Sequence, residues 1–167
     1  LLAIISLFLF NPFSYSQTKS PKEYLGYDLG SRFSRHHKVV GYFEHVSSSS
    51  KNVKLIKYGE TYEKRSLNLA IVTSPSNFSK LEDIRKNQLR SARLIDGEPG
   101  EQDIAIVWLS YNVHGNESVS TEVAMQTLFE LVNPENSETK KWLENTVVII
   151  DPCINPDGRE RYVNWYS

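Results

Sequence analysis

A histidine and a glutamate stand three positions apart in YNVHGNESVS, residues 111–120, and both side chains can bind a metal ion. His114 offers an imidazole nitrogen and Glu117 a carboxylate oxygen, and both atom types suit Zn²⁺ at about 2.0–2.2 Å. Gly115 relaxes the backbone between them, and Asn116 is the expected N-cap of a following helix. The spacing alone leaves a second interpretation open, the polar start of a helix, where the macrodipole favours a carboxylate.

A second polar motif, DPCINPDGRER, lies at residues 151–161. Its centre, Asn155, Pro156, Asp157 and Gly158, is predicted to form a tight turn, because proline fixes φ and glycine tolerates a positive φ. We expect a structural role for these four residues rather than a direct part in catalysis.

The remaining composition disfavours other kinds of site. The chain has a net charge of −1, and no basic stripe or run of like charges favours nucleic acid or an anionic membrane as a partner. Cys153 is the single cysteine, so an internal disulfide is excluded, and beside Ile154 it is typical of a small buried hydrophobe rather than a nucleophile. His36, His37 and His45 lie far upstream and are expected to be solvated or packed.

Both polar motifs are expected at the ends of strands in one parallel βαβ unit. The continuous apolar runs at residues 103–111 and 146–152 are typical of strands buried on both faces. Between them, apolar residues at helical spacing predict a helix over 119–132 and a short helix over 138–143. Parallel strands deliver their carboxyl ends to one edge of the sheet, so the two motifs should meet there. A metal ion would also balance the carboxylate if that edge is poor in water.

Three further elements are predicted upstream of this unit. Residues 36–46 have the spacing of an amphipathic helix, residues 53–71 alternate like a hairpin or meander, and residues 81–94 suggest a charged surface helix. A hydrophobic content of 40% is enough for one core of ordinary domain size. The pattern therefore predicts one α/β domain.

The first ten residues, LLAIISLFLF, are apolar apart from Ser6, and small residues follow at 14–16. Ten apolar residues are too few to cross a hydrocarbon layer of about 30 Å, so this segment is typical of a secretory signal. We expect residues 1–16 to be a signal peptide whose n-region is missing, and residues 17–167 to be the amino-terminal portion of the α/β domain. A buried helix or a truncated membrane anchor is the alternative interpretation.

The order of these motifs resembles the zinc carboxypeptidase family, the M14 metallopeptidases. VHGNES follows a strand, a helix comes next, and a second strand runs into the sequence VVIIDPCINPDGRERY. The resemblance begins at about Lys22, is firmest from Ile104 to Tyr162, and is closest to exported bacterial members. It implies that His114 and Glu117 are ligands of one Zn²⁺ ion.

The resemblance also implies a fold and a reaction. The fold is a partial three-layer α/β/α sandwich with a mixed, largely parallel central sheet, incomplete at its C-terminal end, with Asn155, Pro156, Asp157 and Gly158 as a turn beneath the site. The reaction, in the complete protein, is removal of residues from the C-terminus of a peptide or protein by water that zinc and a glutamate activate. An exported, periplasmic or extracellular protein without stable membrane insertion after signal cleavage is expected.

The resemblance is incomplete because no histidine follows His114. The third zinc ligand, the oxyanion-stabilising arginine, the residues that grip the substrate carboxylate, the mobile tyrosine and the catalytic glutamate are expected beyond Ser167. We therefore predict no catalytic residue within these 167, no peptidase activity for the isolated chain, and weak zinc affinity.

Two other functions are weighed against this one. A zinc amidohydrolase of the aspartoacylase type would use the same fold on acyl amino acids, but the export signal argues against an enzyme of intracellular metabolites. A non-catalytic α/β binding module would keep the scaffold without the chemistry, and the presence of both His114 and Glu117 argues against that.

Overall fold

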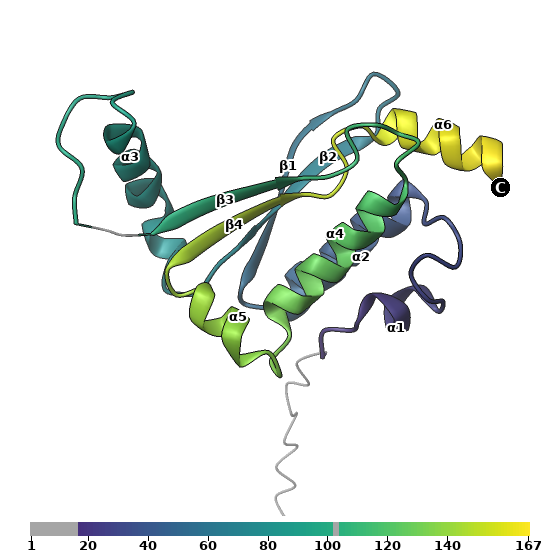
Figure 1. The fold of residues 1–167 in the computed structure, drawn as a ribbon, viewed down its shortest axis with the longest axis horizontal. Helices are drawn as coiled ribbons and strands as arrows, with labels where there is room; N and C mark the ends of the chain where they lie inside the picture. Colours follow the sequence, from purple (N-terminus) through teal and green to yellow (C-terminus); the bar gives the residue numbers. More distant parts are fainter. Residues whose placement is uncertain (1–16, 102–103) are drawn as a thin grey trace, which may run out of the picture.

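A computed structural model describes residues 17–101 and 104–167, and the predicted signal peptide lies outside the described residues. Figure 1 shows the helices and strands along the chain, with α6 at the C-terminal end. Their bounds are α1 Pro21–Leu25, α2 His36–Ser49, β1 Val53–Glu60, β2 Ser66–Val72, the 3₁₀ helix Phe78–Lys80, α3 Leu81–Ser91, β3 Ala105–Ser110, α4 Val119–Val132, α5 Ser137–Trp142, β4 Thr146–Asp151 and α6 Pro156–Tyr166.

The strands form one mixed sheet in the order β1-β2-β4-β3. The predicted hairpin is confirmed, because β1 pairs antiparallel with β2, and the predicted parallel unit is confirmed by the pairing of β3 with β4. The pairing of β2 with β4 is antiparallel. The mixed α/β class is therefore as expected, although the described sheet contains one parallel and two antiparallel pairings, fewer parallel pairings than "largely parallel" implies.

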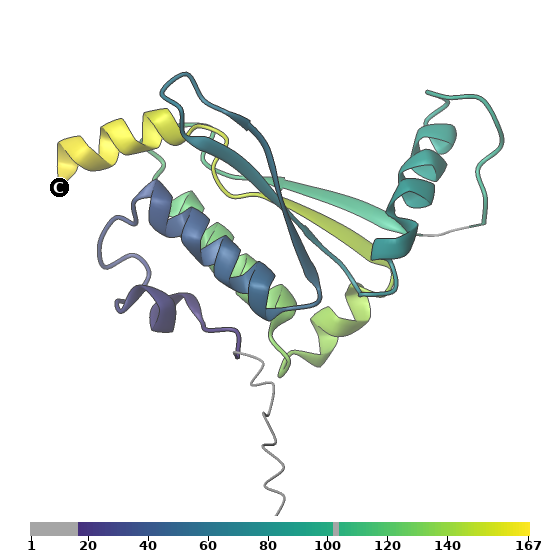
Figure 2. The same cartoon turned by 180° about the vertical axis from the view of Figure 1, so that it is seen from behind.

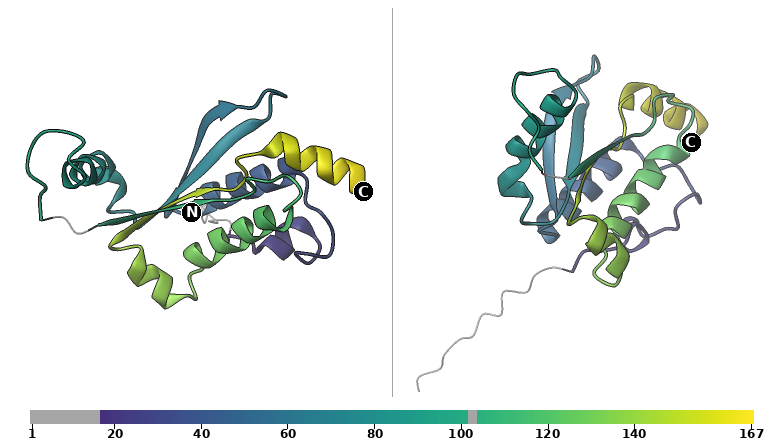
Figure 3. Two further views of the ribbon diagram at one scale, coloured as in Figure 1. Left: turned by 45° about the horizontal axis from the view of Figure 1, so that its top comes forward. Right: turned by 60° about the vertical axis from the view of Figure 1, so that its left-hand side comes forward.

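Helices lie on both faces of the sheet. On one face, α2 packs beside α4 over the main core, and the view from behind brings α2 to the front (Figure 2). On the other face, α3 covers one end of the strands (Figure 3). The side chains of β4 alternate accordingly, since Val148 and Ile150 join the core under α2 and α4, and Val147 and Ile149 face the cluster under α3. This is a partial three-layer arrangement.

The prediction that both strands of the parallel unit are buried on both faces is wrong for β3. Strand β4 lies between β2 and β3, whereas β3 is the edge strand of the described sheet. Ile106, Val107 and Trp108 are 39%, 41% and 62% exposed. A continuous apolar run indicates a strand but not its place in the sheet, and a strand at an edge has a neighbour on one side only.

The predicted helices are confirmed, with small changes at their ends. Helix α4 begins and ends where the apolar spacing predicts, and its Ala124, Met125 and Leu128 are fully buried in the main core. Helix α2 extends three residues beyond the predicted residue 46, to Ser49. No helix among the described residues is long and apolar enough to cross a membrane.

Candidate metal centre

The two polar motifs meet at the carboxyl ends of β3 and β4, as predicted. The amide of Tyr111 donates to the carbonyl of Asp151 at 2.9 Å, and the amide of Ile154 donates to the carbonyl of Tyr111 at 3.1 Å. The side-chain amide of Asn155 donates to the carbonyl of Val113 at 3.0 Å. Figure 1 shows the loops after both strands at one end of the sheet, beside α6.

His114 and Glu117 stand at the two ends of a tight turn, residues 114–117, called here the ligand turn. The amide of Glu117 donates to the carbonyl of His114 at 3.0 Å and closes the turn. The imidazole Nδ1 of His114 lies 3.3 Å from Oε1 of Glu117. The two candidate ligand atoms therefore face each other before any metal is bound.

The separation of these two atoms fits a zinc ion. Two ligands at about 2.0–2.2 Å from a tetrahedral zinc stand about 3.3–3.6 Å apart. The observed 3.3 Å between Nδ1 and Oε1 lies at the lower end of that range. Among the described residues, no group of three or more His, Cys, Asp or Glu side chains could hold a metal ion.

Three expectations about the ligand turn are wrong. The site is not poor in water, because the side chains of His114 and Glu117 are 70% and 63% exposed. Glu117 precedes α4 instead of lying in its first turn, since the helix begins at Val119. The N-cap is Ser118, not Asn116, and its side chain makes no capping hydrogen bond. An N-cap motif is therefore not what holds this turn.

The four residues expected to form a turn begin α6 instead. Asn155 is the N-cap and its side chain accepts a hydrogen bond from the amide of Gly158 at 3.0 Å, with Pro156 in the first helical turn. Proline suits that position because it has no amide hydrogen to leave unpaired. The residue types that favour a turn also favour a capped helix start, so the sequence did not distinguish the two.

Glycine is needed at position 115 because the backbones of the two motifs touch there. A Cβ atom at Gly115 would stand 2.1 Å from the carbonyl carbon and 2.6 Å from the next amide nitrogen after Gly158. Real Cβ atoms do not approach backbone that closely. The ligand turn therefore lies directly against the start of α6, and the positive φ predicted for Gly158 is not the reason for that glycine.

Asp157 joins the start of α6 to the turn between β1 and β2. Its carboxylate accepts hydrogen bonds from the Thr61 hydroxyl at 2.7 Å, the Glu63 amide at 3.1 Å and the Arg65 guanidinium at 2.7 Å. Desolvation opposes the effect, but these hydrogen bonds lower the pKa of Asp157 below its usual value. The expected structural role of Asp157 is consistent with these contacts.

A buried arginine holds the backbone next to the ligand turn. It was not singled out from the sequence. Arg159 is fully buried, and its guanidinium donates to the carbonyls of Ser34 and Ser118. Burial lowers its pKa, and the carboxylates of Glu122 and Glu160 oppose that effect. Ser118 follows Glu117 directly, so Arg159 holds the chain at the exit of the ligand turn.

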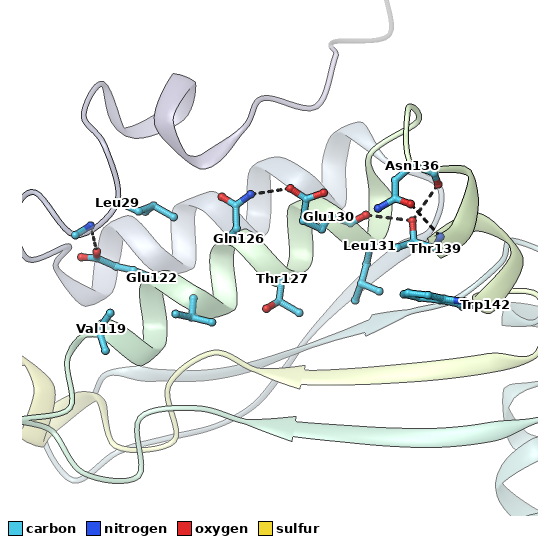
Figure 4. A pocket seen from close by; sticks show the side chains of 12 residues that line it. Leu29, Val119, Glu122, Gln126, Thr127, Glu130, Leu131, Asn136, Thr139 and Trp142 are labelled. Atoms are coloured by element: carbon cyan, nitrogen blue, oxygen red, sulfur yellow. Dashed lines mark hydrogen bonds between the residues drawn. The ribbon is translucent and has the colours of Figure 1, made fainter.

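A cavity of about 580 Å³ beside α4 is a separate feature. It runs along α4 from Val119 to α5, where Trp142 lines it (Figure 4). In the close-up, Gln126 points to Glu130, to which it donates at 2.8 Å, and Glu122 points to the backbone beside Leu29. Neither His114 nor Glu117 lines this cavity, so it is not the candidate metal centre.

The fold and the site together define a class of protein. The α/β sheet places a histidine and a glutamate side by side at the carboxyl ends of a parallel strand pair, where ligands bind in open α/β folds, and both side-chain types can bind a metal ion. A model of the zinc carboxypeptidase family matches residues 39–166. The chain belongs to the zinc carboxypeptidase family.

Solved carboxypeptidase structures share the fold. The chain is similar to carboxypeptidase A from Helicoverpa armigera, with a TM-score of 0.56 and 19% identity over 78% of this chain and 28% of that one. It is also similar to a metallo-carboxypeptidase from Burkholderia cenocepacia, with a TM-score of 0.55 and 16% identity over 78% of this chain and 29% of that one. The chain thus spans less than a third of the length of either protein.

Proposed function

We propose that His114 and Glu117 supply two ligands of one zinc ion in a metallocarboxypeptidase that removes residues from the C-terminus of peptides or proteins. The observation that carries the proposal is the 3.3 Å between Nδ1 of His114 and Oε1 of Glu117, a separation that suits a tetrahedral zinc. The family match and the shared fold support the same reaction class.

In this proposal the chain's own residues hold and place the metal. His114 offers Nδ1 and Glu117 offers Oε1 from opposite ends of a turn that their backbone hydrogen bond closes. Both side chains are exposed, which leaves room for further ligands and for a substrate. Zinc supplies Lewis acidity there, which polarises a carbonyl group and lowers the pKa of water.

His114 and Glu117 supply two of the three protein ligands that a catalytic zinc site typically has. The chain alone is then expected to bind zinc weakly and to lack peptidase activity. Robust zinc-dependent hydrolysis of a peptide by the purified chain would contradict this part of the proposal.

Zinc binding by single variants tests the ligand assignment. We expect His114→Ala and Glu117→Gln to weaken binding of zinc by at least about tenfold in equilibrium dialysis or calorimetry, because each removes one of two ligands. His37→Ala and Glu44→Gln are matched controls at exposed positions on α2 and should bind as the wild type does. Equal zinc binding by His114→Ala and His37→Ala would show that His114 is not a zinc ligand.

We also propose that residues 1–16 direct export and are removed. The apolar run at residues 1–10 and the small residues that follow support this. N-terminal sequencing of protein recovered outside the cytoplasm should then begin at Gln17. A mature protein that retains the apolar run would contradict the proposal.

A further inference from the structure

Asn112 lies between the end of β3 and the ligand turn, in a backbone conformation that few residues adopt. Its φ is +58°, in the left-handed region, where asparagine is tolerated far better than residues with bulkier side chains. The residue is only 3% exposed. A buried polar side chain in a left-handed conformation calls for partners that hold it there.

The carboxamide of Asn112 contacts both candidate ligand residues through their backbones. Its nitrogen donates to the carbonyl of His114 at 2.8 Å and to the carbonyl of Glu117 at 3.3 Å. The carbonyl of His114 also accepts from the Glu117 amide, so the two ends of the ligand turn and the Asn112 side chain form one hydrogen-bonded unit.

A thiol from the other motif fixes which way the carboxamide points. The Sγ of Cys153 donates to Oδ1 of Asn112 at 3.1 Å. A thiol donor on one side and two carbonyl acceptors on the other allow only one orientation of the amide. Burial raises the pKa of Cys153 to about 12, so the thiol stays protonated and remains a donor at neutral pH.

Further hydrogen bonds connect Cys153 to the sheet. The amide of Cys153 donates to Oδ1 of Asp151 at 3.3 Å, and the hydroxyl of Tyr58 donates to the other oxygen of that carboxylate. Asp151 is the last residue of β4 and Tyr58 lies in β1. A connected set of hydrogen bonds therefore runs from Tyr58, which is 46% exposed, through the buried residues Asp151, Cys153 and Asn112 to the backbone of the two exposed ligand residues.

We propose that Asn112 is a positioning residue for the zinc ligands. Its carboxamide presets the ligand turn before a metal binds, and the thiol of Cys153 orients that carboxamide. The zinc part of this inference rests on the proposed function, whereas the order of the turn in the metal-free chain does not. Groups that orient metal ligands typically change affinity by about 10–100-fold when they are removed.

Two substitutions at Asn112 distinguish the contribution of its side chain from that of its backbone conformation. Asn112→Gly keeps the positive φ and removes the carboxamide, and Asn112→Asp replaces the donor nitrogen by an oxygen that faces two carbonyls. Asn116→Ala is the matched control, because Asn116 is exposed in the same turn and makes no side-chain hydrogen bond within the described residues.

The first readout is hydrogen exchange of the Glu117 amide in the metal-free, purified chain. We expect Asn112→Gly and Asn112→Asp to speed exchange of this amide by about tenfold or more, because the turn that protects it is no longer held. Asn116→Ala should leave it unchanged. Equal exchange in the wild type and in Asn112→Gly would overturn the inference.

The second readout is zinc affinity, compared with thermal stability. We expect both Asn112 variants to bind zinc about tenfold more weakly at a temperature where they remain fully folded. A lowered Tm with unchanged zinc affinity and unchanged Glu117 exchange would mean a general packing role and would also overturn the inference. If the wild type binds zinc no better than His114→Ala, the proposed function fails, and the exchange measurement still decides the role of Asn112.

Cys153 provides a test by rescue. Cys153→Ala removes the donor to Asn112, and Cys153→Ser keeps one in a smaller side chain. We expect faster exchange at Glu117 in Cys153→Ala and rates near the wild type in Cys153→Ser. The same rate in both variants would show that the thiol donor does not orient the carboxamide.

Discussion

The ligand turn and the residues beneath it differ in how far water reaches them. His114 and Glu117 are largely exposed and touch each other. The side chains that hold their backbone, those of Asn112, Asp151 and Arg159, are buried and hydrogen-bonded. If His114 and Glu117 bind zinc as proposed, the metal is bound by side chains whose removal should cost little stability, and these are positioned by side chains whose removal should cost much.

The largest expected difference in stability is between substitutions of two arginines in α6 that lie two residues apart. Arg159→Ala leaves two carbonyls and two nearby carboxylates without their buried cation, and we expect a loss of about 3–5 kcal/mol in the free energy of unfolding. Arg161→Ala removes an exposed ion pair with Glu63 and should cost about 1 kcal/mol or less. Denaturant titration measures both. Similar losses would mean that Arg159 is not the support described above.

Gly115→Ala tests the close packing of the two motifs. The new Cβ would meet the backbone at Gly158, so the ligand turn must move, and we expect a loss of about 1–3 kcal/mol together with weaker zinc binding. Gly59→Ala is the control, because a Cβ there meets only a Leu67 methyl at 3.8 Å. Unchanged stability and zinc binding in Gly115→Ala would contradict the direct contact.

Asn155→Ala removes the N-cap of α6 and the hydrogen bond to Val113. We expect a loss of about 1–2 kcal/mol, as for other N-caps, and faster hydrogen exchange in the ligand turn. Asn136→Ala removes the N-cap of α5, where the side chain accepts from Thr139, and should lower stability without affecting the ligand turn. The same hydrogen-exchange rates in the ligand turn of both variants would show that Asn155 does not hold that turn.

The sequence predicts most of this fold and the meeting of the two polar motifs at one edge of the sheet. Local patterns were sufficient for the hairpin, for α4 and for the parallel pair, because apolar spacing and chain order determine them. His114 and Glu117 could be singled out by their residue types and the strand before them. What could not be predicted depends on long-range contacts, namely the exposed edge position of β3, the helix start at Asn155 and the buried roles of Asn112 and Arg159.

Neither Asn112 nor Arg159 was identified from the sequence, and only Asn112 has a sequence feature that could have indicated its role. Asn112 sits two positions before His114 in a loop, and asparagine is common in left-handed conformations, so its backbone could have been suspected. Arg159 follows a motif rich in turn-forming residues, and no local pattern indicates that an arginine is buried there. Only the contact of α6 with Ser34 and Ser118 explains it.

The buried carboxyl of Asp151 should give a smaller effect that depends on pH. Burial raises its pKa, although hydrogen bonds from Tyr58 and the Cys153 amide oppose this. The folded state then binds this proton more tightly than the unfolded chain, so the contribution to stability is present below the usual pKa of 3.8 and is lost as pH rises through the raised value.

Asp151→Asn cannot lose that proton, so its stability relative to the wild type should rise over this pH window. Denaturant titrations at several pH values measure the difference. Tyr58→Phe removes a hydrogen bond that lowers the pKa and should shift the window of pH dependence upwards. A difference between Asp151→Asn and wild type that does not change with pH would contradict the raised pKa.

The smallest expected change in stability is at His114 itself. Its side chain is 70% exposed and its hydrogen-bonded backbone remains in His114→Ala, so we expect the free energy of unfolding to change by no more than about 0.5 kcal/mol. Zinc binding should nevertheless fall more than in any variant of the supporting residues, because a ligand is lost rather than displaced. His37→Ala, also exposed, should change neither quantity. A large loss of stability in metal-free His114→Ala would mean that the imidazole itself helps to hold the turn. The contrast between exposed ligand residues and buried supporting residues would then not apply to His114.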